Sequence, residues 1–209
     1  CDVMGHGMRS ALVTAMVRVL LDTAALRTAD PGQFLSEMNG RLRGLLKPDD
    51  SPMFATAFYL VADVATGRLC YATAGHPPPL HLQRHAAQAA PLRVPPRAGP
   101  ALGLFGEATY ATSECPLAAG DVILLFTDGL FEVTNADTQE EYGQQRLLAA
   151  AHQHMHLPPS ELCDALIADV RAFAGNSALE DDACLLSLEV ARVGVESAAS
   201  PSNRKERTP

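Results

Sequence analysis

The hydrophobic positions in the first part of the chain repeat at helical spacing. Between residues 10 and 26, apolar side chains recur every three or four positions, and this stripe is expected to face a core: Leu12, Val13, Met16, Val17, Val19 and Leu20. A second helix is predicted from Pro31, a favoured first-turn residue, to about Leu46. The pattern therefore predicts two consecutive amphipathic helices.

The pattern then changes to one typical of strands. Phe54 to Ala62 and Arg68 to Ala74 are rich in β-forming residues, and they flank "DVATG", a turn ending in Gly67, so they predict a hairpin. The following "HPPPLHLQ" is expected to be extended, because each proline disfavours a helical conformation of the residue before it. Residues 84 to 100 are rich in alanine, proline and arginine without periodicity, and they predict a surface loop.

The second half of the chain alternates between strand and helix. A strand from Val122 to Phe126 follows the turn signal "AAGD". Helices are predicted at 143–154 and from about 160 to 173, with Gly175 at the position of a C-terminal cap. A final apolar strand is expected in "ACLLSLEV", and the polar segment 193–209 is expected to be a disordered tail.

Composition narrows the class of protein. A chain of 209 residues that is 47% hydrophobic is long enough to bury a core of its own. Its net charge of −8 argues against nucleic acid and against an anionic membrane surface as partners. No apolar run approaches the roughly 18 residues that span a bilayer, and the five cysteines include no C-x-x-C pair. We therefore expect a reduced, cytoplasmic protein.

Acidic residues stand at three strand boundaries, and they are the main candidates for chemistry. They are Asp2 in "DVMGHG", Asp128 in "LLFTDGLFE", and the adjacent Asp181 and Asp182 in "LEDDACLL". Carboxylates at sheet ends can converge, and converging carboxylates repel one another unless a cation neutralises them; oxygen ligands suit Mg²⁺ or Mn²⁺. Taken singly, Asp-Gly is more often a turn and "EDD" a solvated loop. Nearby glycines, expected to allow close backbone approach, stand at positions 5, 7 and 129.

Four segments occur in a recognisable order: "DVMGHGMRSAL", "FATAFYLVADVATGRLCYATAGHPPPL", "GDVILLFTDGLFEVTNADTQEEYGQQRL" and "EDDACLLSLEV". Together, over residues 1–192, they resemble the PPM-type (protein phosphatase 2C-like) metal-dependent serine/threonine phosphatases. The similar branch is the bacterial one of stage II sporulation protein E and the sigma-B regulatory phosphatases. The resemblance implies an α+β fold, an α-β-β-α sandwich of two antiparallel sheets flanked by helices. It also implies N-terminal truncation, because the family carries a further aspartate, with about two strands, upstream of the "DV" motif.

The resemblance assigns roles to the acidic residues. Asp2 would bridge two divalent ions, Mn²⁺ or Mg²⁺, and the backbone carbonyl of Val3 would complete one of them. Asp128 and Asp181 would ligate the other ion. Asp182 competes with Asp181 for that role, and Asp181 is preferred as the first residue of the motif. A water held between the ions would be the nucleophile, since metal binding lowers its pKa toward neutrality.

The histidines are less clearly functional. His6 could contact the phosphate or protonate the leaving seryl oxygen, but a turn histidine bonded to the backbone is the more frequent role. His76, in "AGHPPP", matches the family pattern and is interpreted as shaping a loop. His152 and His156 have a spacing that zinc can use, but no third ligand motif stands nearby, so a zinc site is disfavoured.

The implied reaction is hydrolysis of phosphoserine or phosphothreonine on a protein, such as a phosphorylated anti-sigma-factor antagonist. Homodimer formation through upstream domains is a further implication. A dehalogenase-type phosphatase would need an aspartate at position 126, which is Phe; cysteine-phosphatase and P-loop motifs are absent from the sequence. The remaining alternative is a catalytically silent module that binds a partner, and the retained aspartates argue against it.

Overall fold

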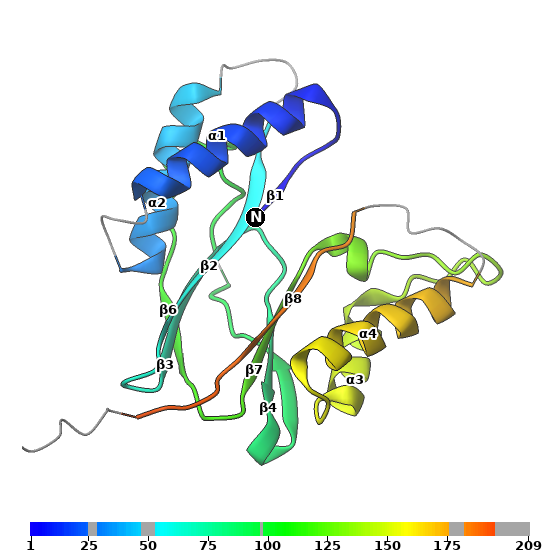
Figure 1. The fold of residues 1–209 in the computed structure, drawn as a ribbon. Helices are drawn as coiled ribbons and strands as arrows, with labels where there is room; N and C mark the ends of the chain where they lie inside the picture. Colours follow the sequence, from blue (N-terminus) through cyan, green and yellow to red (C-terminus); the bar gives the residue numbers. More distant parts are fainter. Residues whose placement is uncertain (25–28, 47–52, 97, 176–181, 195–209) are drawn as a thin grey trace, which may run out of the picture.

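The computed structural model describes residues 1–24, 29–46, 53–96, 98–175 and 182–194. In these residues the chain forms four α-helices, eight strands and two 3-10 turns (Figure 1). In chain order they are β1 (Asp2–Val3), α1 (Met8–Ala24), α2 (Pro31–Leu45), β2 (Ala55–Asp63), β3 (Arg68–Ala74), β4 (Leu80–Gln83), η1 (Arg84–Ala86), β5 (Gln88–Pro91), β6 (Ser113–Pro116), β7 (Val122–Phe126), η2 (Asp128–Leu130), α3 (Gly143–His154), α4 (Pro159–Ala174) and β8 (Leu185–Glu189). The expected tail lies almost wholly outside the described residues.

The strands form two antiparallel sheets of four, in the orders β1-β2-β3-β6 and β5-β4-β7-β8. Helices α1 and α2 cover the outer face of the first sheet, and α3 and α4 cover the outer face of the second (Figure 1). Each helical layer has its own core: Phe34 and Leu42 of α2 pack on the first sheet, and Leu162 and Leu166 of α4 on the second. The predicted α-β-β-α sandwich is confirmed.

A third apolar cluster fills the space between the sheets. It joins Leu69 and Tyr71 of β3 to Ile123 of β7, with Phe58 and Leu60 of β2 packed against it. Side chains alternate along a strand, so β2 sends Ala57 and Tyr59 to the helices and Phe58 and Leu60 to this inner layer. The same alternation places Thr56 on the inner side, where the candidate site lies.

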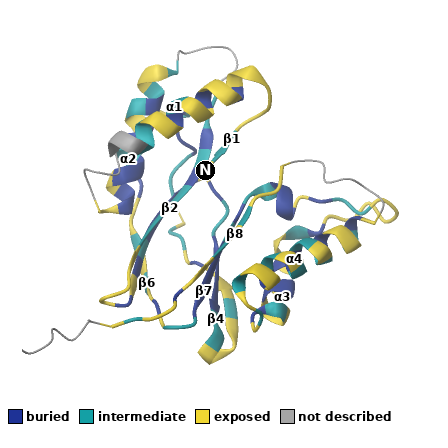
Figure 2. Ribbon diagram, in the orientation of Figure 1, coloured by how far each residue is buried: buried dark blue, intermediate teal, exposed yellow. Residues whose placement is uncertain are grey.

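Helix α1 buries a narrower stripe than its pattern predicts. Val13 and Val17 are buried, but Leu12 is 56% exposed and Val19 is 64% exposed. Both lie on the outward side of the helix, where Figure 2 shows exposed residues along its length. The prediction was wrong for these two residues because the apolar positions almost encircle α1, and only contact with α2 and β1 selects the buried side.

The segment 84–100 is not a simple surface loop. Gln88–Pro91 forms β5, which pairs with β4 in register from Leu80↔Pro91 to Gln83↔Gln88. The tight connection has Ala87 in the left-handed region, at φ 49°. The guanidinium of Arg84 donates to the carbonyl oxygens of Met155 and Leu157, at 2.7 and 2.5 Å. The strand was missed because its sequence, "QAAP", has low β-propensity and pairs only because β4 offers an edge.

The remaining elements agree with the pattern to within one or two residues. These are the β2–β3 hairpin, β7, the helices α2, α3 and α4, and the cap at Gly175, whose N–H donates to the Arg171 carbonyl at 3.2 Å. Strand β6 was not predicted. In the part of the chain that the structure covers, no helix combines the length and apolar character needed to cross a membrane.

Candidate active site between the two sheets

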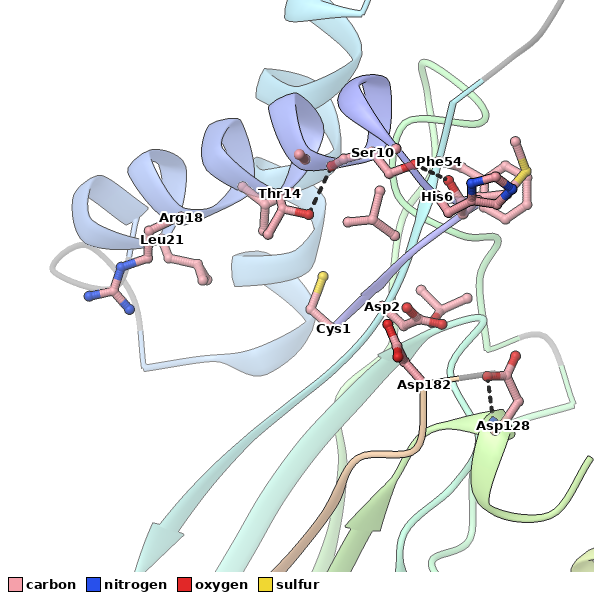
Figure 3. A pocket seen from close by; sticks show the side chains of 18 of the residues that line it. Cys1, Asp2, His6, Ser10, Thr14, Arg18, Leu21, Phe54, Asp128 and Asp182 are labelled. Atoms are coloured by element: carbon pink, nitrogen blue, oxygen red, sulfur yellow. Dashed lines mark hydrogen bonds between the residues drawn. The ribbon is translucent and has the colours of Figure 1, made fainter. Parts of the chain in front are cut away.

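An open cavity of about 1090 Å³ lies where β1 meets α1, the end of β7 and the segment before β8. Five of the six residues predicted from the sequence line it: Asp2, Val3, His6, Asp128 and Asp182. Figure 3 shows the carboxylates of Asp2, Asp128 and Asp182 from three separate segments of the chain, with His6 farther off. The sixth residue, Asp181, lies outside the described residues, so its preference over Asp182 stays a prediction.

Asp2 is placed by the pairing of β1 with β2. It lies opposite Thr56, and Val3 lies opposite Ala55. The Met4 N–H continues the ladder by donating to the Phe54 carbonyl at 3.0 Å. Directly paired residues share a face of the sheet, so Asp2 and Thr56 both face the inner layer.

The turn between β1 and α1 requires its two glycines. Gly5 and Gly7 have φ values of 79° and 87°, in the region that residues with a side chain rarely adopt. The turn is closed by the Ser10 hydroxyl, which donates to the Met4 carbonyl at 3.1 Å. An added Cβ at Gly7 would meet nothing within 4 Å. These glycines therefore serve backbone conformation, and the expected close approach does not apply to them.

Asp128 begins η2 at the end of β7 and is partly buried. Its Oδ1 accepts a hydrogen bond from the Gly129 N–H at 3.0 Å. Its carbonyl accepts from the N–H groups of Phe131 and Glu132, at 2.9 and 2.8 Å. The Asp128 carboxylate is thus carried by a short turn that these hydrogen bonds hold, and the Gly129 N–H orients its Oδ1.

The turn that carries Asp128 is bonded directly to the segment that carries Asp182. The Thr127 hydroxyl donates to the Asp182 carbonyl at 3.3 Å and accepts from the Cys184 N–H at 2.9 Å. The Thr127 N–H also donates to the Cys184 carbonyl at 3.1 Å. These bonds fix the two acidic segments relative to each other.

Gly129 is the position where close approach was predicted correctly. A Cβ there would lie 2.7 Å from the Asp182 carbonyl oxygen and 3.0 Å from its carbonyl carbon. Because both atoms are backbone, Gly129→Ala should displace the Asp182 segment and lower the free energy of unfolding by about 1–3 kcal/mol. Urea unfolding monitored by circular dichroism measures this loss.

Gly40→Ala is the matched control for that substitution. Gly40 lies within α2, and an added Cβ meets nothing within 4 Å. The change should raise the free energy of unfolding by about 0.5–1 kcal/mol, since alanine is the better helix former. A neutral or stabilising Gly129→Ala would contradict the close packing of η2 on residue 182.

The donors at this site suit a hard divalent cation. Asp2, Asp128 and Asp182 contribute carboxylate oxygens, and Val3, whose backbone carbonyl is a further candidate ligand, lines the same cavity. Among the described residues, no three histidine, cysteine or acidic side chains are grouped closely enough to hold an ion by themselves. Asp181 is not among those residues.

Four neighbours of the acidic residues were not singled out as site residues from the sequence. Glu132 and Thr56 line the cavity, and Thr127 and His76 support it. Glu132 follows Asp128 by four residues, a spacing that places both on one side of a helical turn. This spacing could have indicated Glu132 as a site residue. The other contacts join residues distant in sequence, and no local pattern announces them.

His76 is buried, with 8% of its surface exposed, between the two sheets. Its Nδ1 lies 2.8 Å from the Thr56 hydroxyl oxygen, and the Phe126 backbone is a polar neighbour of the ring. Burial lowers the pKa of His76 from 6.5 to about 4, while the Phe126 backbone and the Asp128 charge oppose the shift. The ring is therefore neutral at neutral pH.

The histidines at the end of α3 have structural partners. His154 Nε2 lies 2.9 Å from Asp169 Oδ2, and His152 Nε2 lies 3.2 Å from the Ala87 carbonyl oxygen. No third ligand for His152 and His156 is present in the described part of the chain. The zinc interpretation gains no support.

Comparison with known proteins gives consistent matches. The family model "Stage II sporulation protein E (SpoIIE)" matches residues 1–191. The chain is 26% identical over 190 residues to the phosphoserine phosphatase RsbP of Bacillus subtilis (strain 168), covering 90% of this chain and 44% of that protein. It is 30% identical over 131 residues to the phosphoserine phosphatase RsbU of the same organism, covering 63% of this chain and 37% of that protein.

A solved structure, the SiaA-PP2C domain of Pseudomonas aeruginosa, superposes with a TM-score of 0.73 at 25% identity. The match covers 90% of this chain and 72% of that one. The fold is thus the one found in PP2C phosphatase domains. The chain spans less than half the length of the two curated relatives.

Proposed function

Because the chain belongs to the stage II sporulation protein E family, the PPM-type phosphatases that include the Rsb regulators, we propose that it hydrolyses phosphoserine or phosphothreonine on a protein. The observation that carries the proposal is the gathering of Asp2, Asp128 and Asp182 on one cavity. They come from β1 and from one end of the β7–β8 pair, where Asp128 follows β7 and Asp182 precedes β8, so only the folded sandwich brings them together.

The cavity is proposed to hold two Mn²⁺ or Mg²⁺ ions. Asp2 would serve both ions, the Val3 carbonyl would serve one of them, and Asp128 with Asp181 or Asp182 would serve the other. When bound, such ions lower the pKa of a coordinated water toward neutrality and offset the charge of the phosphoryl group. The oxygen donors on the cavity wall support this choice of cation.

The protein's own residues prepare the site by holding these carboxylates on rigid backbone. Asp2 is fixed by the β1–β2 ladder, and Asp128 by the η2 turn. Thr127 fixes the segment of Asp182 through its hydroxyl. His6, exposed at the cavity wall, is proposed to donate a proton to the leaving seryl oxygen, a contribution typically of about 10²–10⁴ in rate.

The proposed substrate is a phosphorylated protein resembling an anti-sigma-factor antagonist. Two relatives named phosphoserine phosphatases support a phosphoprotein, and the net charge of −8 argues against nucleic acid. A cytoplasmic location and a homodimer formed through upstream domains stay predictions.

The test is hydrolysis of a phosphoserine peptide by the protein with Mn²⁺, with Mg²⁺, and with excess chelator. We expect hydrolysis with metal and loss of nearly all of it on chelation, restored by added Mn²⁺. Hydrolysis that survives complete chelation would reject the metal mechanism. A protein that binds a phosphoprotein partner and hydrolyses nothing would instead support the silent partner-binding module.

A further inference from the structure

One buried ring joins the strand end of Asp2 to the turn of Asp128. His76 Nδ1 bonds to Thr56, which is paired directly opposite Asp2. The same ring has the backbone of Phe126, two residues before Asp128, as a polar neighbour. The two contacts belong to different sheets, so His76 connects them at the level of the site.

The backbone around His76 is itself held in place. The Thr73 hydroxyl donates to the His76 carbonyl at 3.0 Å and accepts from the His76 N–H at 3.2 Å. Gly75, with φ 69°, makes the bend that turns the chain from the first sheet toward the second. The ring position is thus set by β3 and not by the cavity.

With little solvent contact, the His76 ring favours its uncharged form, in which one nitrogen can donate and the other can accept. A neutral imidazole provides this combination, and a buried polar group without partners would be costly. The lowered pKa of His76 agrees with a neutral ring. An apolar residue could fill the same volume, but it could not bond to the Thr56 hydroxyl.

We propose that His76 and Thr56 are positioning residues that hold the Asp2 strand and the Asp128 turn at a fixed separation across the two sheets. The inference rests on the proposed function, because it concerns the residues that would hold the cation. It assigns to "AGHPPP" a role in the site beyond shaping a loop. Neither residue is catalytic, since each acts through the placement of its neighbours.

The first test compares Thr56→Val with Thr56→Ser. Valine keeps the shape and removes the hydroxyl, while serine keeps the hydroxyl. Thr56→Val and His76→Gln should each weaken Mn²⁺ binding about 10- to 100-fold, the usual effect of losing a residue that orients a metal ligand. The Mn²⁺ dissociation constant of Thr56→Ser should stay within about threefold of the wild-type value. Calorimetric titration of the protein with Mn²⁺ gives the dissociation constants.

His81→Gln is the control for disturbing a buried histidine. His81 is 7% exposed, bonds to Asp121 at 2.8 Å, and does not line the cavity. The substitution should lower stability and leave the Mn²⁺ dissociation constant unchanged. The double variant Thr56→Val/His76→Gln should bind Mn²⁺ about as weakly as His76→Gln alone, because that variant has already lost the contact with Thr56.

A second measurement does not depend on metal. Amide hydrogen exchange in the metal-free protein should accelerate at Met4 and Thr127, whose N–H groups bond to Phe54 and Cys184. Exchange at these two amides should accelerate in both Thr56→Val and His76→Gln. Exchange in helices α3 and α4 should remain unchanged in both variants. Acceleration at Thr127 in Thr56→Val is the decisive result, because Thr56 belongs to the first sheet and Thr127 follows β7 of the second.

The outcomes separate this inference from the proposed function. If the wild type binds Mn²⁺ and the two variants bind it equally well, the positioning role is overturned. If the wild type binds no Mn²⁺, the proposed metal site fails, and the exchange pattern alone decides whether His76 couples the two segments. If exchange instead accelerates uniformly through the protein, His76 is a general stabilising residue, and the inference is rejected.

Discussion

Asp128→Asn should lower the rate of phosphoserine hydrolysis by about two orders of magnitude or more, the scale lost when an electrostatic catalytic element is removed. The substitution removes one negative charge from the cavity, and an amide oxygen is a poorer ligand for a hard cation than a carboxylate. The fold should survive, because Asn can still accept the Gly129 N–H bond that Asp128 Oδ1 accepts at 3.0 Å. Initial rates at saturating Mn²⁺, with a circular dichroism melt of both proteins, measure the effect.

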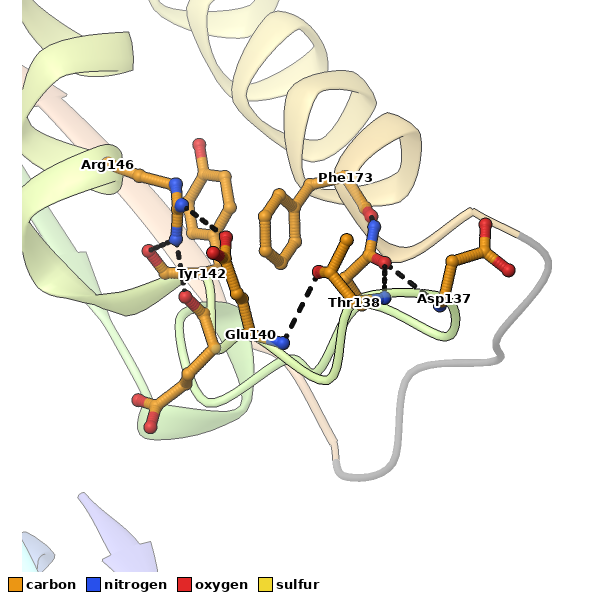
Figure 4. A network of polar contacts seen from close by, with 8 residues as sticks. Asp137, Thr138, Glu140, Tyr142, Arg146 and Phe173 are labelled. Atoms are coloured by element: carbon orange, nitrogen blue, oxygen red, sulfur yellow. Dashed lines mark hydrogen bonds and ion pairs between the residues drawn. The ribbon is translucent and has the colours of Figure 1, made fainter.

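Asp137→Asn is the matched control, since it makes the same chemical change nine residues away. Asp137 is exposed, and its N–H bonds to the Asn135 side chain at 2.9 Å. Figure 4 shows its carboxylate directed away from the contacts among Glu140, Arg146 and Phe173. The rate of phosphoserine hydrolysis by Asp137→Asn should equal that of wild type. Equal rates in Asp128→Asn and wild type would remove Asp128 from the site.

Acidification from pH 6.5 to about pH 4 should cost the fold about 3 kcal/mol through His76 alone. The pKa of His76 falls from 6.5 to about 4 on folding because the ring is buried. Between these two values the unfolded chain binds a proton that the folded protein does not, so stability falls as the pH falls. Above pH 6.5 this contribution is constant, because the ring is neutral in both states.

The comparison with His76→Gln isolates this effect from the carboxyl groups that titrate in the same range. Urea unfolding of the metal-free proteins at several pH values between about 7 and 4 should give a steeper decline for wild type. The difference between the two curves should develop below pH 6.5 and level off near pH 4. Parallel curves would show that His76 is not held neutral by the fold.

The local pattern of the sequence was sufficient to predict the elements whose buried and exposed sides differ strongly in polarity. Helices α3 and α4 and the β2–β3 hairpin were predicted nearly to the residue, because their apolar periodicity and turn residues agree with each other. The aspartates at strand ends were found in the same way, since a carboxylate next to an apolar strand is visible in the letters. Close backbone approach was predicted alike for Gly5, Gly7 and Gly129, and of these three the structure shows it only at Gly129.

Tertiary contacts decided the features for which the local pattern is ambiguous. Leu12 and Val19 are as apolar as Val13 and Val17, and only the position of α2 and β1 determines which of them are buried. Strand β5 exists because β4 has an edge to pair with, although "QAAP" has little β-propensity. His76 reads as a loop residue because Thr56 and Phe126 are 20 residues before it and 50 after it. Their approach to one ring depends on the packing of two sheets, a long-range property that no window of sequence contains.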